Sequence, residues 1–306
     1  MDIIQTLAQQ LNLTAEQVGK TVQLIDEGNT IPFIARYRKE VTGSLDDSVL
    51  RTLDEKLTAL RNLAQRKQEV QDLIGAQGKL TEEVRAAIER AATVTEVDDI
   101  YRPFRPKRKT RASVARERGL EDLAILLFAQ EKSYTPSIEE QAARFVDPER
   151  EVPDVAAALQ GAMDIVAEEV SDNADYRREL RRLTFDAGSL TSKAAKEEDS
   201  VYAMYYDFSE PLRKLPGHRI LAIHRGEKEE FLKVALTVPE DVVLGYLYNR
   251  VLSGNRSPAE PYVREAVTDA YNRLIAPSIE REIRNDLFDT ACEGAIKVFS
   301  DNLGHL

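Results

Sequence analysis

The sequence is poor in the residues that build disulfides and metal centres, and it has no apolar run long enough to cross a membrane. Its one cysteine, Cys292, excludes an intramolecular disulfide and a cysteine-based zinc cluster, and it fits a reducing cytoplasm. Because Cys292 lies among Ala291, Ala295 and Ile296, we expect a buried, unreactive thiol. The first thirty residues carry neither a basic n-region nor a long apolar h-region, so we expect no signal peptide and a cytoplasmic location.

The sequence also lacks the short motifs of common enzyme classes. It contains no G-x-x-x-x-G-K-[ST], no G-x-G-x-x-G after a strand and no G-x-S-x-G. His218 and His224 have no cysteine or acidic cluster at ligand spacing, so we expect ordinary histidines. We therefore predict a non-enzymatic protein with no cofactor and no metal. The densest acidic group on a predicted helix, for which a solvated face is sufficient explanation, comprises Glu168, Glu169, Asp172 and Asp175.

Net positive charge is absent as well. The 306 residues carry a formal charge of -11, which argues against nonspecific affinity of the whole surface for nucleic acid. Any such contact must be local. With 42% hydrophobic and 31% charged residues the chain has a soluble, globular balance, and its length predicts two or three subdomains.

The stretch TIPFIARYRKEVTGSLDD, residues 30–47, places cations beside aromatic residues in this acidic chain. Thr30 is a predicted N-cap of a helix over residues 31–39 that turns Phe33 and Ile34 inward. The basic residues on its wet side are candidate nucleic-acid contacts, namely Arg36, Arg38 and Lys39.

Helical spacing of apolar residues dominates the rest of the first hundred residues. Thr14 and Gln17 form a capping box before one helix. A long helix begins at Ser44 and continues to Gly75, and another covers residues 82–92. These should pack as antiparallel helices around a Leu-rich seam.

One strongly basic segment, residues 101–119, holds eight Lys or Arg against one Glu. Pro103 and Pro106 forbid a regular helix there and favour extended backbone. Tyr101 and Phe104 could stack on bases, while the cations neutralise phosphates. The alternative is that the segment pairs with the protein's own acidic helices. Its candidate contacts are Arg102, Arg105, Lys107, Arg108, Lys109 and Arg111.

A possible helix-turn-helix corner follows, with Ala115 and Gly119 four residues apart. The second helix, residues 120–129, would have to read DNA, but Glu121 and Asp122 at its start would be repelled by phosphates. We interpret this element as a packing corner.

The second half remains mostly helical. Helices are predicted over residues 155–172 and 176–184. Pro216 and Gly217 suit a type II turn, and the residues after it alternate as in two strands, 219–224 and 231–238, forming one β-hairpin. Pro277 divides the last region, and a long helix follows it.

These patterns predict a mostly α-helical, elongated multi-helix scaffold with helix-turn-helix-like corners and one small β-hairpin. The predicted regions are an N-terminal helical region (1–100), the basic linker (101–119), a helical region (120–200), a turn and hairpin (201–238), and a C-terminal helical region (239–306).

Four long motifs, in order, resemble the amino-terminal half of the bacterial Tex family of transcription accessory proteins: TIPFIARYRKEVTGSLDD, DIYRPFRPKRKTRASVARERGLEDLA, YYDFSEPLRKLPGHRILAIHRGEKE and LIAPSIEREIRNDL. The resemblance implies RNA binding and a relation to eukaryotic Spt-type elongation factors. It also implies further domains, ribonuclease H-like, helix-hairpin-helix and an RNA-binding OB-fold, none of which is in this sequence. We therefore expect a fragment whose main nucleic-acid contacts, with RNA or DNA, lie in the missing domains.

Two classes of function remain open. The chain is either the scaffold portion of a nucleic-acid-binding transcription factor, with secondary contacts of its own, or a protein-interaction module that docks on RNA polymerase or another transcription factor. Neither class involves a membrane.

Overall fold

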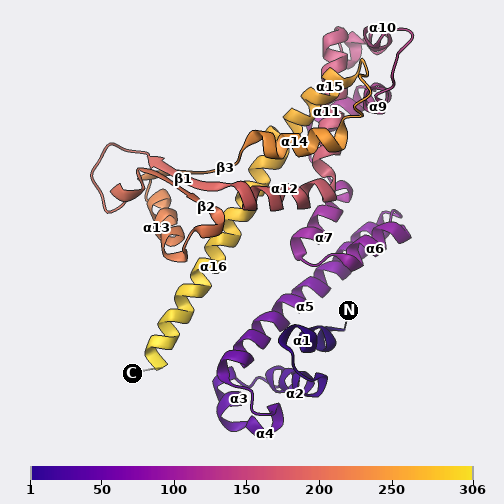
Figure 1. Ribbon diagram of the computed structural model, residues 1–306. Helices are drawn as coiled ribbons and strands as arrows, with labels where there is room; N and C mark the ends of the chain where they lie inside the picture. The colour runs from indigo at the N-terminus through magenta and orange to yellow at the C-terminus, as the bar shows by residue number, and fades with distance from the viewer. Residues whose placement is uncertain (1, 305–306) are drawn as a thin grey trace. The chain divides into compact units, whose positions relative to one another are not determined.

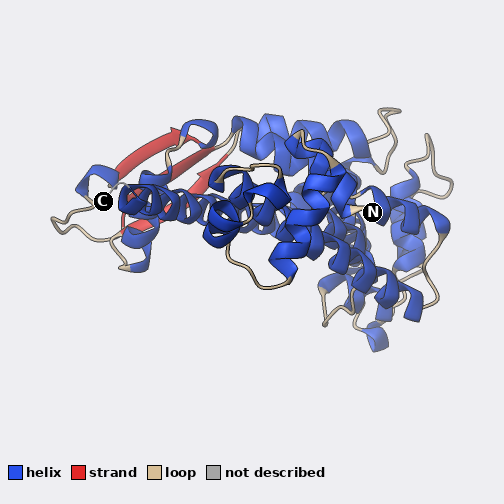
Figure 2. Cartoon of the chain, turned by 90° about the horizontal axis from the view of Figure 1, so that it is seen from below, coloured by secondary structure: helices blue, strands red, loops and turns tan. Residues whose placement is uncertain are grey.

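The computed structural model describes residues 2–304 and is 70% helical, which confirms the mostly α prediction (Figures 1 and 2). The chain forms two compact units, which we call unit 1 (Met1–Arg105) and unit 2 (Pro106–Leu306). Figure 2 shows the strands gathered in one group, and they all belong to unit 2.

Unit 1 is built of helices along a single long one, α5. In order, its elements are α1 (Ile3–Leu11), α2 (Ala15–Asp26), α3 (Ile31–Tyr37), α4 (Lys39–Thr42), α5 (Asp47–Ala76), α6 (Glu82–Arg90), α7 (Val94–Tyr101) and a 3-10 turn (Arg102–Phe104). The predicted capping box before α2 is confirmed, because the backbone N–H of Gln17 donates to the Thr14 hydroxyl at 3.1 Å and the side-chain oxygen of Gln17 accepts from the backbone N–H of Thr14 at 3.2 Å. Ser44 is not the cap of α5. It has a positive φ, and the side chain of Asp46 accepts from the first turn instead.

The apolar side chains of unit 1 form separate clusters along α5. Leu53 and Leu57 pack with α1 and α2, while Leu50 packs around the fully buried Ile34 of α3. Farther along α5, Val70 and Ile74 pack with α6 and α7. Each short helix thus buries one stripe against a common partner, and α3 is held by its inner face alone.

Unit 2 contains the remaining helices and the sheet. Its helices are α8 (Arg111–Glu117), α9 (Glu121–Ala129), α10 (Ile138–Ala143), α11 (Val155–Asp172), α12 (Ala174–Ala187), α13 (Gly217–Lys228), α14 (Glu240–Val251), α15 (Glu260–Asp269) and α16 (Ala276–Gly304). Helices α8, α9 and α15 pack on α11, and Figure 1 shows α9 and α15 beside α11. At the closest approach Gly161 faces α9, where an added Cβ would lie 2.3 Å from a methyl carbon of Leu120. Leu120 and Ala115 are buried, which is the packing expected of this corner.

The sheet differs from the predicted hairpin. Strands β1 (Ser189–Ala194), β2 (Asp207–Pro211) and β3 (Leu232–Thr237) form an antiparallel sheet of order β2-β1-β3. The strand predicted over 231–238 is present as β3, but its partner is β1. Residues 219–224 belong to α13, and Gly217 lies in the first turn of that helix rather than in a type II turn. Ile220 and Ile223 bury a helical stripe, a spacing that overrides the apparent alternation.

Pro277 does not divide the last helical region. A π-helical segment (Ala270–Ile275) joins α15 directly to α16, so that Pro277 lies within a continuous helix. A π-segment alters the backbone hydrogen-bonding pattern just before the proline, and such segments are the places where long helices accommodate irregular residues.

Candidate nucleic-acid interface

The basic segment divides into parts with different structures. Arg102 lies in the 3-10 turn after α7, and Arg111 begins α8, so the prediction of extended backbone is wrong at both ends of the candidate set. The stretch between them has no regular structure, and Thr110 caps α8 by accepting from the Ser113 amide at 3.0 Å. The boundary between the two units falls inside this stretch, after Arg105.

Lys107 is held by carboxylates of α11. Its ammonium lies 3.0 Å from Glu168 and also donates a hydrogen bond to Asp172. Glu168 further accepts from Arg116 at 2.8 Å and from the Thr110 hydroxyl at 3.1 Å. The segment is therefore pinned to α11 at Lys107 and Thr110, as the alternative of internal pairing predicts for these residues.

Glu168 is the centre of this network and is not part of a solvated face. Its side chain is only 11% exposed, so the solvated-face prediction is wrong for this residue. Burial raises the pKa of Glu168, but the hydrogen bonds from Arg116 and Lys107 outweigh burial, and the pKa lies below its ordinary value. The sequence offered no direct signal for this, because α11 and the basic segment meet only in the fold.

The next cations remain free of such partners. Arg108, Lys109 and Arg111 are exposed, and within residues 2–304 none of them lies within ion-pair distance of a carboxylate. Lys109 and Arg111 act on carboxylates only at longer range, favouring the ionised forms of Glu151 and Asp164, respectively. They follow Lys107 directly, so a pinned backbone carries three unpaired positive charges. Most of the arginines on α12 behave differently, since Arg178 and Arg182 are exposed but bound to carboxylates.

The two candidates of this segment in unit 1 are partly engaged. The guanidinium of Arg105 lies 5.5 Å from the ring centre of Tyr101. Tyr101 is buried and Phe104 is half-buried against the core of unit 1, so neither ring is displayed for stacking as predicted. Arg102 is half-buried, with its Nε buried and without a hydrogen-bond partner.

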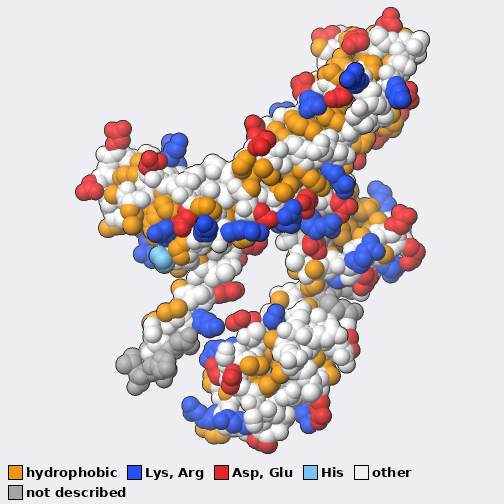
Figure 3. Space-filling model, in the orientation of Figure 1, with side chains coloured by type: hydrophobic (Ala, Val, Ile, Leu, Met, Phe, Trp, Pro, Cys, Tyr) orange, Lys and Arg blue, Asp and Glu red, His pale blue; other side chains and the backbone are white. Residues whose placement is uncertain are grey.

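The candidates at α3 and the start of α4 lie on a more open surface. The helix predicted over 31–39 is interrupted at Arg38, so that Arg36 belongs to α3 and Lys39 begins α4. Ile34 points inward as predicted, but the same prediction is wrong for Phe33, whose ring is exposed next to that of Tyr37. Arg36 and Lys39 are exposed, and Arg38 is half-buried. Figure 3 shows Lys and Arg side chains gathered over the part of unit 1 that Figure 1 labels α3.

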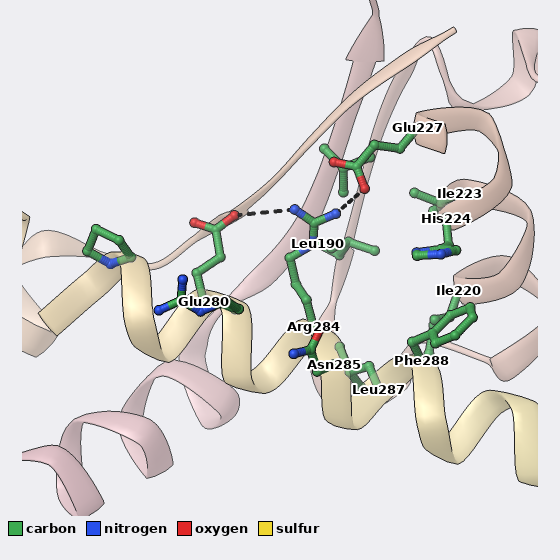
Figure 4. A pocket seen from close by; sticks show the side chains of 13 residues that line it. Leu190, Ile220, Ile223, His224, Glu227, Glu280, Arg284, Asn285, Leu287 and Phe288 are labelled. Atoms are coloured by element: carbon green, nitrogen blue, oxygen red, sulfur yellow. Dashed lines mark hydrogen bonds and ion pairs between the residues drawn. The ribbon is translucent and has the colours of Figure 1, made fainter. Parts of the chain in front are cut away.

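A cavity of about 360 Å³ lies in unit 2 between α13, α16 and the sheet (Figure 4). Leu190, Ile220 and Ile223 form its apolar floor. Arg284 spans one side, where it is paired with Glu227 on α13 and lies 3.8 Å from Glu280 on its own helix.

The histidine of this cavity has a packing role. His224 stacks on Phe288 with ring centres 4.0 Å apart, and it lies on α13 rather than on a strand. Cys292 was predicted to be buried, but on α16 it is only half-buried.

In the part of the chain that the structure describes, no group of His, Cys, Asp or Glu side chains could hold a metal ion. None of the described helices has the length and apolar character needed to span a bilayer.

By themselves, the helical fold and the exposed cations define only a class, a helical scaffold with a local basic surface. Comparison with known families is more specific. A model described as "Tex-like protein N-terminal domain" matches residues 1–75, and one described as "Tex central region-like" matches residues 133–299. The chain belongs to the Tex family, which confirms the resemblance seen in the sequence.

Relatives match this chain along its whole length. "Uncharacterized protein YdcI" of Bacillus subtilis is 42% identical over 308 residues, covering 99% of this chain and 42% of that protein. "Transcriptional accessory protein Tex" of Neisseria gonorrhoeae is 36% identical over 314 residues, covering 100% and 41%. Human "S1 RNA-binding domain-containing protein 1" is 29% identical over 321 residues, covering 100% and 32%. The chain thus spans less than half the length of each of these proteins.

Proposed function

We propose that the chain is the scaffold portion of a cytoplasmic, non-enzymatic transcription accessory factor and makes nucleic-acid contacts of its own. Membership of a family with transcriptional accessory proteins supports the general role. The observation that carries the proposed contact is the row of exposed, unpaired cations at Arg108, Lys109 and Arg111. The RNA-binding name of the human relative favours RNA as the ligand.

The pinning of the segment favours binding. A flexible basic loop would lose conformational entropy when it met phosphates. Here Lys107 and Thr110 already hold the backbone on both sides of Arg108 and Lys109, through Glu168. The ordering cost is therefore largely met in the free protein, and the three cations can each neutralise a phosphate.

The test is salt-dependent binding of a labelled RNA and DNA by wild type and by a variant with Arg108→Ala, Lys109→Ala and Arg111→Ala. Log K falls with log salt, and each lost phosphate contact should make this negative slope shallower by about 0.7 to 0.9. RNA and DNA should weaken alike, because phosphate contacts carry no sequence information.

A matched control removes the same charge elsewhere in unit 2. Arg178, Arg182 and Arg264 are exposed but paired with carboxylates, so their triple Ala variant should bind nearly as wild type does. If both triple variants reduce binding equally, net charge alone is responsible. If neither does, the segment makes no nucleic-acid contact.

A second function is docking on RNA polymerase or another transcription factor. The observation that favours it is the cavity between α13, α16 and the sheet, because its apolar floor could receive an apolar side chain of a protein partner. Filling the cavity with Val234→Phe should weaken association with such a partner and leave nucleic-acid binding unchanged.

A further inference from the structure

Helix α3 displays an aromatic pair to solvent. Phe33 is 37% exposed and Tyr37 is 56% exposed. They lie four residues apart on one face of the helix, and their ring centres are 5.2 Å apart. Large aromatic side chains normally gain free energy by burial, so two neighbouring rings that remain partly exposed are available to stack on a ligand.

Three cations lie close to this pair in the sequence, and one of them contacts a ring. The guanidinium of Arg38 lies 5.2 Å from the ring centre of Phe33. Arg36 and Lys39 are exposed and form no ion pair within the described chain. Three other exposed cations of unit 1 are paired, Lys20 with Glu16, Arg51 with Asp47 and Arg61 with Asp26. Lys79 and Arg90 are exposed without an ion pair in the described part of the chain, but no exposed aromatic pair lies beside them there.

We propose that α3 and the start of α4 form a stacking surface for single-stranded nucleic acid, with Phe33 and Tyr37 of α3 receiving unpaired bases and Arg36 of α3 and Lys39 of α4 contacting phosphates. Aromatic rings beside a cationic track are the combination that binds single strands without sequence preference. In a duplex the base faces are covered, so only the cations would contribute.

This inference rests on the proposed function in taking nucleic acid as ligand, but it uses a separate surface in unit 1. The test compares the full chain with a Phe33→Leu, Tyr37→Leu variant, using a single strand and a duplex of about 12 nucleotides each. Stacking contributes roughly 5- to 150-fold in affinity for each base. We expect at least about tenfold weaker binding of the single strand, an unchanged duplex affinity and an unchanged salt slope.

Controls separate stacking from general effects. Phe128 and Phe185 are exposed to a similar degree in unit 2, and their double Leu variant should leave the affinity for the single strand unchanged. The pair Arg36→Ala, Lys39→Ala should flatten the salt slope for both ligands. Thermal unfolding of each variant confirms that the fold is retained.

Two outcomes would overturn the inference. One is an unchanged single-strand affinity when Phe33 and Tyr37 are replaced. The other is an equal loss for single strand and duplex. If either occurs while the Arg108, Lys109 and Arg111 variant still flattens the salt slope, the stacking surface is refuted and the proposed function stands.

Discussion

Replacing Glu168 with Gln tests whether this residue holds the basic segment in place. The substitution keeps the size of the side chain and removes its charge. Lys107, Arg116 and Thr110 all donate to Glu168 in the wild type. The glutamine can still accept hydrogen bonds through one oxygen, but the two cations lose their shared, nearly buried counter-charge.

The expected destabilisation is about 2–3 kcal/mol. A hydrogen bond to a charged group contributes about 1.5–3 kcal/mol, and breaking a fully buried pair costs about 3–5 kcal/mol. The lower range applies here because both cations keep other partners: Lys107 donates to Asp172, and Arg116 lies 3.0 Å from Glu169. For a unit of about 200 residues this corresponds to a fall in Tm of roughly 4–12 °C.

The assay is urea unfolding followed by far-ultraviolet circular dichroism, with Glu169→Gln as the matched control. Glu169 is the neighbouring residue and contacts the same arginine, but it is 63% exposed. Its loss should cost about 0–1 kcal/mol. If the two variants are equally stable, Glu168 does not organise the segment and the account of its network is wrong.

The difference between wild type and Glu168→Gln should also depend on pH. The pKa of Glu168 is lowered in the folded state, so its contribution to the free energy of unfolding is complete above the ordinary Glu pKa of about 4.3. It is lost as pH falls through the lower folded value. The two proteins should therefore differ at about pH 7 and converge in strong acid. A difference that persists there would refute the assignment to the ionised carboxylate.

Further predictions concern packing and buried polar groups. Gly161→Ala should destabilise the protein by about 1–3 kcal/mol, because the added Cβ would clash with a methyl group of Leu120. Gly245→Ala should stabilise it by about 0.5–1 kcal/mol, because this helical glycine faces open space. Urea unfolding measures both changes. Arg177 is fully buried and donates to Ser278 at 2.7 Å, so Arg177→Ala should lower the free energy of unfolding by about 3 kcal/mol or more. A decrease of less than about 1 kcal/mol would contradict this. Tyr262 donates to Glu139, which raises its pKa to about 12; an ultraviolet titration of Tyr262→Phe should lack one phenol that ionises near that pH. Because this pKa is raised, the stabilisation by Tyr262 should be complete below about pH 10 and lost as pH rises towards 12.

Local signals in the sequence predicted local structure well. The cap at Thr14 and the helical spacing along α5 are properties of short segments, and both are confirmed. The pairing of the sheet was missed because β1 pairs with β3 about forty residues later, and such pairing leaves no local pattern beyond short alternation. For the same reason the alternating residues 219–224 were assigned to a strand, although tertiary packing makes them helical.

The candidate site was predictable in composition and not in geometry. The unusual charge of residues 101–119 is visible in the sequence, but which cations are neutralised depends on α11, fifty or more residues later. Likewise the exposure of Phe33 depends on which face of α3 packs, and in the fold that face is the one with Ile31, Ile34 and Ala35. The site residues therefore remain predictions, now divided into paired and unpaired cations.

The π-segment between α15 and α16 determines which side of α16 faces the core. The buried stripe of this helix has an apolar residue at every fourth position: Val263, Val267, Tyr271, Ile275, Ile279 and Ile283. On a helix with 3.6 residues per turn, that stripe would drift by about 40° at each step and soon leave the core. The wider turns of Ala270–Ile275 take up part of the drift. Deleting one residue there would rotate α16 by about 100° about its axis. The direction in which this helix presents its side chains therefore depends on the exact number of residues in the π-segment.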